Sequence, residues 1–476
     1  MTTLWAEAEL ARALGTPSAP LAVPVGGVSI DTRTLAPGDL FFAIKGETSD
    51  GHDFVARAFE AGAAAAVVAS PRVAGLAAHE PTFVVDDTLR AMERLGRAAR
   101  ARAKARVVAV TGSVGKTSAK EMLRVALGRF GPTHASAASY NNHWGVPLSL
   151  SRLPASAAFA VFEIGMNHAG EITPLVAMAR PHVALVTTIA PVHIEHLGSI
   201  EGIADAKAEI FSGLEPGGAA VLNHDAPQFE RLAAAALGRR ARVVTFGADA
   251  ACDARLVEVS ATGGGSRIRA RIFGREFEFV LGAPGRHMAE NALGVLLACE
   301  ALGADVAGAA AALAEFAPQQ GRGARLTLTS ATGPFTVIDE SYNANPASMC
   351  AALALLGAVE PAAAGRRIAV IGDMLELGPD GAAMHAALAS ELADNRVDML
   401  FGAGPLTRAL YEAAPPAMRA AWAERSSDLL PRLADALHGG DVVMVKGSNG
   451  SRMGPLVAAL RERFASAERD VRKSQC

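Results

Sequence analysis

The sequence of 476 residues has few cysteines, no strong net charge and no long apolar run, and each of these absences excludes a class of protein. Its cysteines are scattered, with no CxxC pair and no zinc-like spacing, which is typical of reduced thiols and argues against a metal ion held by sulfur. Lys plus Arg number 45 against 48 for Asp plus Glu, so the chain has no overall basic field that would hold nucleic acid. The four cysteines are Cys252, Cys299, Cys350 and Cys476.

The sequence also lacks membrane signals. No apolar stretch reaches the length that a membrane-spanning helix needs. The opening segment MTTLWAEAELARALG carries Glu7 and Glu9 where a signal peptide would carry positive charge. We therefore expect a soluble cytoplasmic protein that binds neither membranes nor nucleic acid, with a monomer as the default.

Hydrophobic residues make up 50% of the chain and charged residues 20%, a balance typical of packed globular domains. Strand-like and helix-like segments alternate, which predicts an α/β fold, and the length predicts more than one domain. We expect a small α/β domain over 1–103 and a central parallel-sheet domain over 104–317, with hairpins near 254–281. A Pro/Gly/Gln-rich hinge then leads into a second doubly wound, Rossmann-like domain over 318–476.

The most informative stretch is VVAVTGSVGKTSAKEML, residues 107–123, where a β-branched apolar run enters a glycine turn and then an amphipathic helix. Such a turn presents backbone N–H groups and the positive end of a helix to a phosphate. Gly112 and Gly115 allow close approach, Lys116 can reach the outer phosphates and Thr117 can bind magnesium. Val110 stands where the usual motif has its first glycine. We still expect this turn to bind ATP or GTP.

Two further strands end in side chains that suit a nucleotide–metal site. Glu163 leaves the strand FAVFEIG at its carboxyl end, where α/β sites lie, although a solvated loop carboxylate is the alternative. His193 follows the strand VALVTTIA, and His196 competes with it for the same role; an ordinary loop histidine is the plainer interpretation.

Lys207 is the residue that most constrains the chemistry. Helical spacing places it on the apolar stripe formed by Ile200, Ile203, Ile210 and Phe211. One interpretation is a stem that carries its charge to water. The other is a desolvated lysine with a lowered pKa, whose neutral amine can react with an electrophile.

Taken together, these motifs resemble the Mur ligases, ATP-dependent amide-forming enzymes of peptidoglycan precursor synthesis, over nearly the whole chain. The motifs that carry the resemblance are TGSVGKTS, FEIGMN, APVHIEHLGSIEGIADAKAEIF, GRHMAENAL and DESYNANP. Within the family, the segments SIDTRTLAPGDLFFAIKGETSDGHDF, SYNNHWGVPLSL and VMVKGSNGSRM look like those of the members that add D-alanyl-D-alanine to UDP-N-acetylmuramoyl-tripeptide. The C-terminal Asn-Pro-Arg or Asn-Pro-Lys motif expected of the diaminopimelate-adding members is missing.

The resemblance implies that Lys116, Glu163, His193 and Lys207 are catalytic, with Lys116 at the β- and γ-phosphates. It also implies two magnesium ions, held by Thr117, Glu163, His193 and a carbamylated Lys207. Arg322 is our choice for an arginine that reaches the phosphates, with Arg325 as the alternative, and Met288 replaces an asparagine common in the family. The other residues that the resemblance places at the nucleotide are Thr111, Gly112, Ser113, Val114, Gly115, Ser118, His287, Asn291, Glu340, Asn343 and Asn345.

The resemblance implies a second set of residues for the UDP-sugar peptide and the dipeptide. Without the family, the pair Asn141–Asn142 would be interpreted as a turn. For the segment SYNANP, a turn and a binding role would both stay open. Lys446, Ser448 and Arg452 are candidates for the dipeptide carboxylate. The full set of substrate residues is Ser29, Asp31, Thr32, Arg33, Lys45, Gly46, Asn141, Asn142, Tyr342, Lys446 and Ser448.

The implied reaction uses ATP to convert the carboxylate of the tripeptide into an acyl phosphate, which the amine of D-alanyl-D-alanine then attacks. Two alternatives stay open: another ligase of the superfamily, of the diaminopimelate-adding or folylpolyglutamate type, and a P-loop NTPase that acts as a switch. Lys207 and the two additional domains favour a ligase over a switch.

Overall fold

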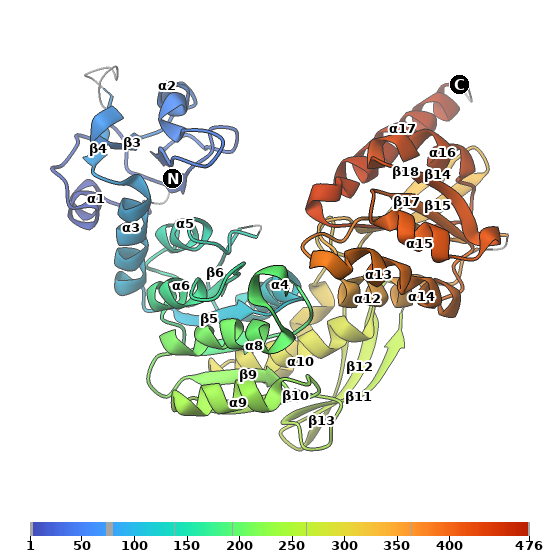
Figure 1. Ribbon diagram of the computed structural model, residues 1–476. Coiled ribbons are helices and arrows are strands. Elements are labelled where there is room, and N and C mark those ends of the chain that lie inside the picture. The colour runs from blue at the N-terminus through green and yellow to red at the C-terminus, as the bar shows by residue number, and fades with distance from the viewer. Residues whose placement is uncertain are drawn as a thin grey trace.

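The protein is described by a computed structural model, and three separate β-sheets divide its chain into three regions (Figure 1). The structure describes residues 3–72, 80–137, 139–192, 194–262, 264–362 and 364–474. Figure 1 shows the N-terminal and C-terminal regions on opposite sides of the central one. The expected three-domain α/β architecture is confirmed, while the boundaries after residues 103 and 317 stay predictions. Within the described ranges, no helix combines the length and apolar character needed to cross a lipid bilayer.

The N-terminal region is a small parallel sheet in the order β1-β2-β3-β4, with helices packed beside it. Its strands are apolar and short, and the long helix that closes the region starts at the N-cap Asp87, whose carboxylate accepts a hydrogen bond from Arg90 N. Its elements are α1 (Glu7–Leu14), β1 (Gly27–Ser29), β2 (Asp39–Phe42), α2 (Val55–Glu60), β3 (Ala65–Ala69), β4 (Thr82–Val85) and α3 (Thr88–Arg102).

The central region is built on a nine-stranded sheet in the order β13-β12-β11-β10-β9-β8-β5-β7-β6. β6 to β10 and β5 pair in parallel, and β11, β12 and β13 form the antiparallel hairpins expected near 254–281. Its strands are β5 (Arg106–Thr111), β6 (Thr133–Ala135), β7 (Phe159–Glu163), β8 (Val183–Val186), β9 (Ala219–Asn223), β10 (Arg242–Gly247), β11 (Ala254–Ala261), β12 (Ser266–Ile272) and β13 (Arg275–Leu281). Its helices are α4 (Lys116–Gly128), α5 (Gly145–Ser151), α6 (Ile172–Ala179), α7 (Ile194–Leu197), α8 (Ile200–Ala208), α9 (Phe229–Gly238), α10 (Arg286–Ala301) and α11 (Val306–Ala312).

The C-terminal region is a six-stranded sheet in the order β14-β15-β19-β16-β17-β18, parallel except for the edge strand β14. Its strands are β14 (Ala324–Ser330), β15 (Gly333–Glu340), β16 (Arg367–Gly372), β17 (Met399–Ala403), β18 (Arg419–Ala423) and β19 (Val442–Lys446). Its helices are α12 (Pro346–Ala358), α13 (Gly381–Ala386), α14 (Leu388–Asp394), α15 (Thr407–Ala413), α16 (Ser426–Ala436) and α17 (Met453–Ser474).

The hydrophobic cores link the regions unequally. One continuous cluster runs from Trp5 in the N-terminal region through α3 to one face of the central sheet. The C-terminal sheet has separate clusters of its own on its two faces. The first two regions are therefore joined by buried apolar contacts, whereas the C-terminal region packs around its own core.

Candidate active site

A cavity of about 300 Å³ lies between the loop that precedes α4 and the strand ends of the C-terminal region. The central region contributes residues from the β5–α4 loop, the end of β7, and helices α8 and α10. The C-terminal region contributes residues that follow β15 and the end of β19. The site is therefore formed at the carboxyl ends of strands from two different sheets, the usual place for ligands in α/β folds.

The loop between β5 and α4 depends on two glycines. Gly112 and Gly115 have φ values of 146° and 85°, which lie in the region that favours glycine. A Cβ atom at Gly112 would overlap the side chain of Thr187, and one at Gly115 would clash with the amide of Asn291. The backbone can thus curl tightly before the N-terminus of α4, as a phosphate-binding loop requires.

Lys116 is the first residue of α4, and its ammonium folds back over this loop. Nζ donates a hydrogen bond to Gly112 O at 2.6 Å. Burial lowers the pKa of Lys116, the Glu163 carboxylate acts in the opposite direction and Arg322 adds to the lowering. The Lys116 ammonium is thus bound to a carbonyl oxygen of its own loop, and a phosphate oxygen could take the place of that carbonyl as its acceptor.

Glu163 is buried at the end of β7 and binds two side chains from different elements. Thr117 Oγ1 donates to Glu163 Oε2 at 2.8 Å, and Asn141 Nδ2 donates to Oε1 at 2.8 Å. A hydroxyl and a carboxylate in contact at the start of α4 are hard oxygen ligands of the kind that magnesium prefers.

Lys207 lies in α8 and is 2% exposed. This burial excludes the interpretation in which the side chain carries its charge out to water. Burial lowers the pKa of Lys207 well below its ordinary value, and the nearby charge of Lys116 lowers it further. Within the ranges given above, Nζ has no hydrogen-bond or ion-pair partner, yet the residue lines the cavity. The structure thus places a buried amine with a lowered pKa at the edge of the site.

Arg322 reaches the cavity from the segment before β14 and bridges two regions. Its guanidinium donates to Ser139 Oγ at 2.9 Å and lies 3.9 Å from the centre of the Tyr342 ring. The alternative candidate, Arg325, is exposed on β14 and is not among the residues that line the cavity. Of the two arginines, Arg322 is the one placed beside the loop that precedes α4.

Glu340 and Lys446 end the neighbouring strands β15 and β19 and form an ion pair at 3.5 Å. Lys446 Nζ also donates to Asn343 O at 2.9 Å, and its side chain is buried. Burial lowers the pKa of Lys446, while Glu340 raises it. His287 lines the same cavity from α10, and burial is the main cause that lowers its pKa.

Asn291 and Met288 also lie on α10. The side chain of Asn291 is close to the backbone of Gly115, and Met288 lines the cavity as an apolar neighbour. Thr111 is fully buried and its hydroxyl has no partner within the described part of the chain. These positions surround the phosphate loop on the side of the central sheet.

Several expected residues either lie outside the cavity lining or also hold local structure. Asn142 accepts a hydrogen bond from Gly145 N in a turn just before α5, as the turn interpretation predicted. Asn345 lines the cavity but also caps α12 by accepting from Ser348 N at 2.9 Å. Ser448 is buried and bonded to Ala344 O and Leu375 N. His193 lies outside the described residues, as does the side chain of His196.

A second cavity, of about 580 Å³, lies between the N-terminal and central regions. Asp31, Thr32 and Arg33 line it as expected, and Arg33 is paired with Asp31 at 2.7 Å. The Arg33 hydrogen bonds lower the pKa of Asp31. Ser29 is buried behind this turn, and Lys45 and Gly46 lie on an exposed turn that is not part of the lining.

The sequence interpretation missed most of the lining of this second cavity, including an arginine and three aromatic residues. Phe54 and Arg57 come from the segment before and within α2, while Tyr140 and Trp144 come from the central region. The rings of Tyr140 and Trp144 meet edge-on with centroids 5.6 Å apart. Their one sequence signal is the local enrichment of aromatics in SYNNHWG, which does not by itself say which region they face.

Comparison with known proteins places this geometry in a family. The family descriptions that match are Mur ligase family, catalytic domain, over residues 24–100; Mur ligase middle domain, over 110–299; and Mur ligase, glutamate ligase domain, over 324–449. The chain belongs to the Mur ligase family. All three regions of this Mur ligase, and not the phosphate loop alone, carry the match.

Individual relatives cover this Mur ligase almost from end to end. The "UDP-N-acetylmuramoyl-tripeptide--D-alanyl-D-alanine ligase" of Escherichia coli is 35% identical over 92% of this chain and 94% of its own length. The protein of the same name from Bacillus subtilis is 34% identical over 92% and 93%. A crystal structure of MurF from Acinetobacter baumannii has a TM-score of 0.81 at 29% identity and covers 96% of this chain and 99% of its own.

Proposed function

We propose that this Mur ligase joins D-alanyl-D-alanine to UDP-N-acetylmuramoyl-tripeptide at the expense of ATP, through an acyl phosphate, in the last cytoplasmic step of peptidoglycan precursor synthesis. The observation that carries the proposal is the cavity in which the phosphate loop, the Thr117–Glu163 pair and the buried amine of Lys207 face the C-terminal region. The choice of substrates rests on the names of relatives that match over more than nine-tenths of the chain.

The residues present fit ATP and magnesium. The loop before α4 has no room for a Cβ at Gly112 or Gly115, and among the described residues Lys116 Nζ bonds only to carbonyl oxygens that a phosphate can replace. Thr117 and Glu163 supply oxygen ligands in direct contact. When bound, ATP with magnesium supplies a phosphoryl group for transfer to the carboxylate.

The chain's own residues would then hold the reacting groups in line. Lys116 would offset negative charge on the phosphates of bound ATP, and Arg322 would leave Ser139 to reach them. Asn141 orients the Glu163 carboxylate toward Thr117. Because an acyl phosphate hydrolyses in water, we propose that the C-terminal region closes on this cavity and excludes solvent while the amine attacks.

Lys207 is proposed to become a carbamate. Its neutral amine adds to the carbon of carbon dioxide, an N–C bond forms, and one proton leaves to solvent. The product is a carboxylate at the end of the lysine stem, which supplies oxygen ligands for a second magnesium ion together with His193. Lys207→Ala should be almost inactive and partly restored by a short carboxylic acid that replaces the carbamate, whereas wild-type activity in the variant would rule the role out.

We propose that the second cavity receives the uridine diphosphate end of the substrate. Arg57 offers a guanidinium for the pyrophosphate, and Phe54, Tyr140 and Trp144 offer apolar surface for the base and sugar. We also propose that the protein works as a cytoplasmic monomer whose domains span 1–103, 104–317 and 318–476. Small molecules are its only proposed substrates, with no nucleic-acid or membrane partner.

The experiment that tests the function measures phosphate release by purified protein with ATP, magnesium and UDP-N-acetylmuramoyl-tripeptide, with and without D-alanyl-D-alanine. Release that requires both substrates, with a product heavier by the dipeptide less one water, is the expected result. Release that ignores the dipeptide would indicate a nucleotide hydrolase, and release that requires diaminopimelate or glutamate instead would indicate another ligase of the superfamily.

A further inference from the structure

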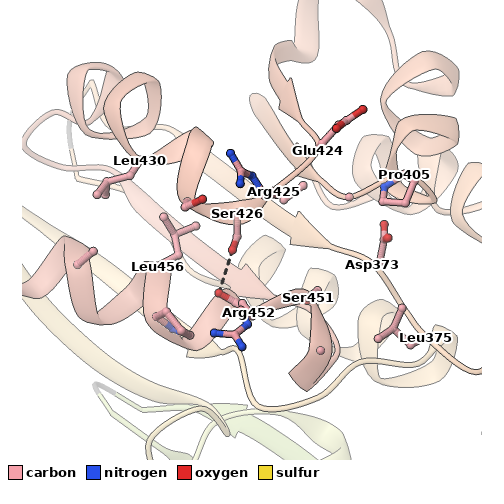
Figure 2. Close-up of a pocket in the computed structure, with 16 residues that line it drawn as sticks. Asp373, Leu375, Pro405, Glu424, Arg425, Ser426, Leu430, Ser451, Arg452 and Leu456 are labelled. Carbon is pink, nitrogen blue, oxygen red and sulfur yellow. Dashed lines mark hydrogen bonds between the residues drawn. The ribbon is translucent and has the colours of Figure 1, made fainter.

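The C-terminal region contains a cavity of about 510 Å³ at the carboxyl ends of β16, β17, β18 and β19 (Figure 2). The helices after β16 and β17 pack on one face of the sheet, and those after β18 and β19 pack on the other, which opens a crevice. Arg452 lines this crevice, and Ser426 Oγ donates to Arg452 O at 3.0 Å. Doubly wound sheets bind their ligands at this position, so the crevice belongs to the ligase site of the proposed function. A different group of side chains, in the central region, has no part in that site.

Three side chains of different chemistry meet at one edge of the central sheet. His224 and Asp225 follow β9, and Cys252 lies in the loop between β10 and β11. Their ligand atoms, an imidazole nitrogen, a carboxylate oxygen and the thiol sulfur, all lie within 4.8 Å of one another. A tetrahedral ion with bonds of about 2.0 to 2.3 Å would space such atoms roughly 3.3 to 3.8 Å apart. Movements of about 1 Å therefore suffice to bring all three atoms onto one ion.

Asp225 is held in place by the loop that carries Cys252. Its Oδ2 accepts a hydrogen bond from Ala248 N at 2.6 Å, and its Oδ1 accepts one from Asp249 N at 3.3 Å. The loop approaches this closely because Gly247, with a φ of 156°, has no Cβ; an added Cβ would lie 2.6 Å from Asp225 Oδ1. An ionised carboxylate offers about four lone-pair positions, so Asp225 can accept both hydrogen bonds and still bind a cation.

His224 is fixed in orientation, but its ring nitrogens are not bound. Its backbone N donates to Phe246 O at 2.8 Å, and its ring packs against Phe229 with centroids 4.5 Å apart. In the described part of the chain, neither ring nitrogen has a hydrogen-bond or ion-pair partner. The residue is half-buried. A positioned imidazole with a free nitrogen is the commonest metal ligand in proteins.

Cys252 lies among negative charges. Asp249 and Asp253 flank it in its own loop, and the Asp225 carboxylate is one of the three atoms that meet. Burial, together with these carboxylates, raises the pKa of the Cys252 thiol to about 12. A metal ion that bonds to this sulfur must therefore displace the thiol proton, which leaves to solvent as the sulfur electron pair forms the bond to the ion.

We infer that His224, Asp225 and Cys252 form a site for a divalent transition-metal ion, and that zinc is the ion which fits their ligand set. A nitrogen, an oxygen and a sulfur together suit zinc, whereas magnesium and calcium prefer oxygen alone. Asp225 is exposed, so the ion has a path from solvent, and a water molecule completes the four-coordinate shell. The inference does not depend on the substrates of the proposed function.

The ion would join two loops that are distant in the sequence. The loop after β9 and the loop before β11 meet because β9 pairs with β10 in parallel. Zinc motifs are recognised from cysteines and histidines at short, regular spacing, and this site has no such spacing. That is why the scattered cysteines argued against a metal ion held by sulfur. A bound ion stabilises the folded protein by an amount that grows with the free ion concentration.

The first test titrates reduced, metal-free, full-length protein with cobalt(II) in the presence of excess magnesium. Magnesium occupies oxygen sites such as the one expected at Thr117 and Glu163. A bond between cobalt(II) and a thiolate gives a charge-transfer absorption that carboxylates and imidazoles do not give. We expect one cobalt ion per chain with this absorption, and its displacement by one zinc ion.

Three variants show which side chains hold the ion. Cys252→Ser and His224→Gln each remove one ligand, and Cys350→Ser, at a half-buried cysteine on α12, is the matched control. Because loss of an outer-shell partner alone weakens metal sites roughly 10- to 100-fold, loss of a ligand should weaken zinc binding by about 100-fold or more. The thiolate absorption should vanish in Cys252→Ser and persist in Cys350→Ser. Thermal unfolding without metal verifies that all three variants are folded.

Thermal unfolding with zinc provides a second readout. At a free zinc concentration about 100 times Kd, the Tm of the wild type should rise by roughly 5 to 11 °C, whereas that of Cys252→Ser should not change. The inference would be overturned by a wild type that shows no thiolate absorption, or by a ligand variant that binds zinc as tightly as the wild type. Neither measurement uses ligase activity, so such a failure would leave the proposed function in place.

Discussion

Replacing Lys207 by methionine should make the protein more stable and inactive. The Lys207 side chain is 2% exposed, and its amine has no partner among the described residues. A buried polar group without a hydrogen bond costs about 1 to 3 kcal/mol, and methionine fills a similar volume without it. Because a domain of about 200 residues shifts its Tm by roughly 2 to 4 °C per kcal/mol, the transition of the central region should rise by about 2 to 12 °C.

Lys120 provides the matched control in the same region. It is also fully buried, but its Nζ donates to Ser136 O at 2.7 Å and lies 2.9 Å from Glu121. Lys120→Met leaves these acceptors without their donor, so it should lower the free energy of unfolding by about 1 to 3 kcal/mol. Differential scanning calorimetry of the two variants should give shifts of opposite sign. A Lys207→Met protein destabilised like Lys120→Met would refute the reasoning, since it would mean that the Lys207 amine is bound in the resting protein.

Other predictions concern the loop, the N-terminal region and the second cavity. Gly115→Ala should raise KM for ATP and destabilise the protein by about 1 to 3 kcal/mol, because Gly115 has a positive φ and an added Cβ would clash with Asn291. Its control is Gly128→Ala at the end of α4, where a Cβ meets open space, and this change should stabilise the protein by about 0.5 to 1 kcal/mol. Calorimetry measures both stabilities, and steady-state kinetics measure KM for ATP. Burial raises the pKa of Asp50, but hydrogen bonds from Arg72 and His52 outweigh burial and lower that pKa overall. Asp50 therefore adds stability above about pH 4 that is lost on acidification. Asp50→Asn should flatten the dependence of the urea-unfolding free energy on acidic pH, and an unchanged dependence would contradict this prediction. Arg57→Gln should raise KM for the UDP-tripeptide but not for ATP, and equal changes in both would count against a UDP site.

Local patterns in the sequence were sufficient for the phosphate loop and the sheets. The β-branched run over 107–111 becomes β5, and the glycines that follow have the φ values that a tight turn needs. The apolar-face position of Lys207 left two interpretations open, and packing of α8 decides between them because the whole side chain is buried. The hairpins β11, β12 and β13 were also readable from their glycine-punctuated alternation.

Contacts between distant segments could not be read in the same way. Arg57 and Tyr140 line one cavity although they come from two different regions, and no local periodicity encodes that approach. Likewise Asn141 and Asn142 are adjacent in sequence, yet one donates to Glu163 and the other holds the turn before α5. The crevice at Arg452 follows from which face of the sheet each helix covers, a property of topology rather than of any motif.

The central claim is that the cavity between the phosphate loop and the C-terminal region activates a carboxylate with ATP for amide formation. The most direct test places oxygen-18 in the terminal carboxylate of UDP-N-acetylmuramoyl-tripeptide and measures the mass of the phosphate released with ATP, magnesium and D-alanyl-D-alanine. An acyl phosphate transfers one carboxylate oxygen to the phosphate, so we predict that each molecule of phosphate released carries a labelled oxygen. Phosphate that carries no label would show that water, and not the carboxylate, takes the phosphoryl group, and would contradict this account.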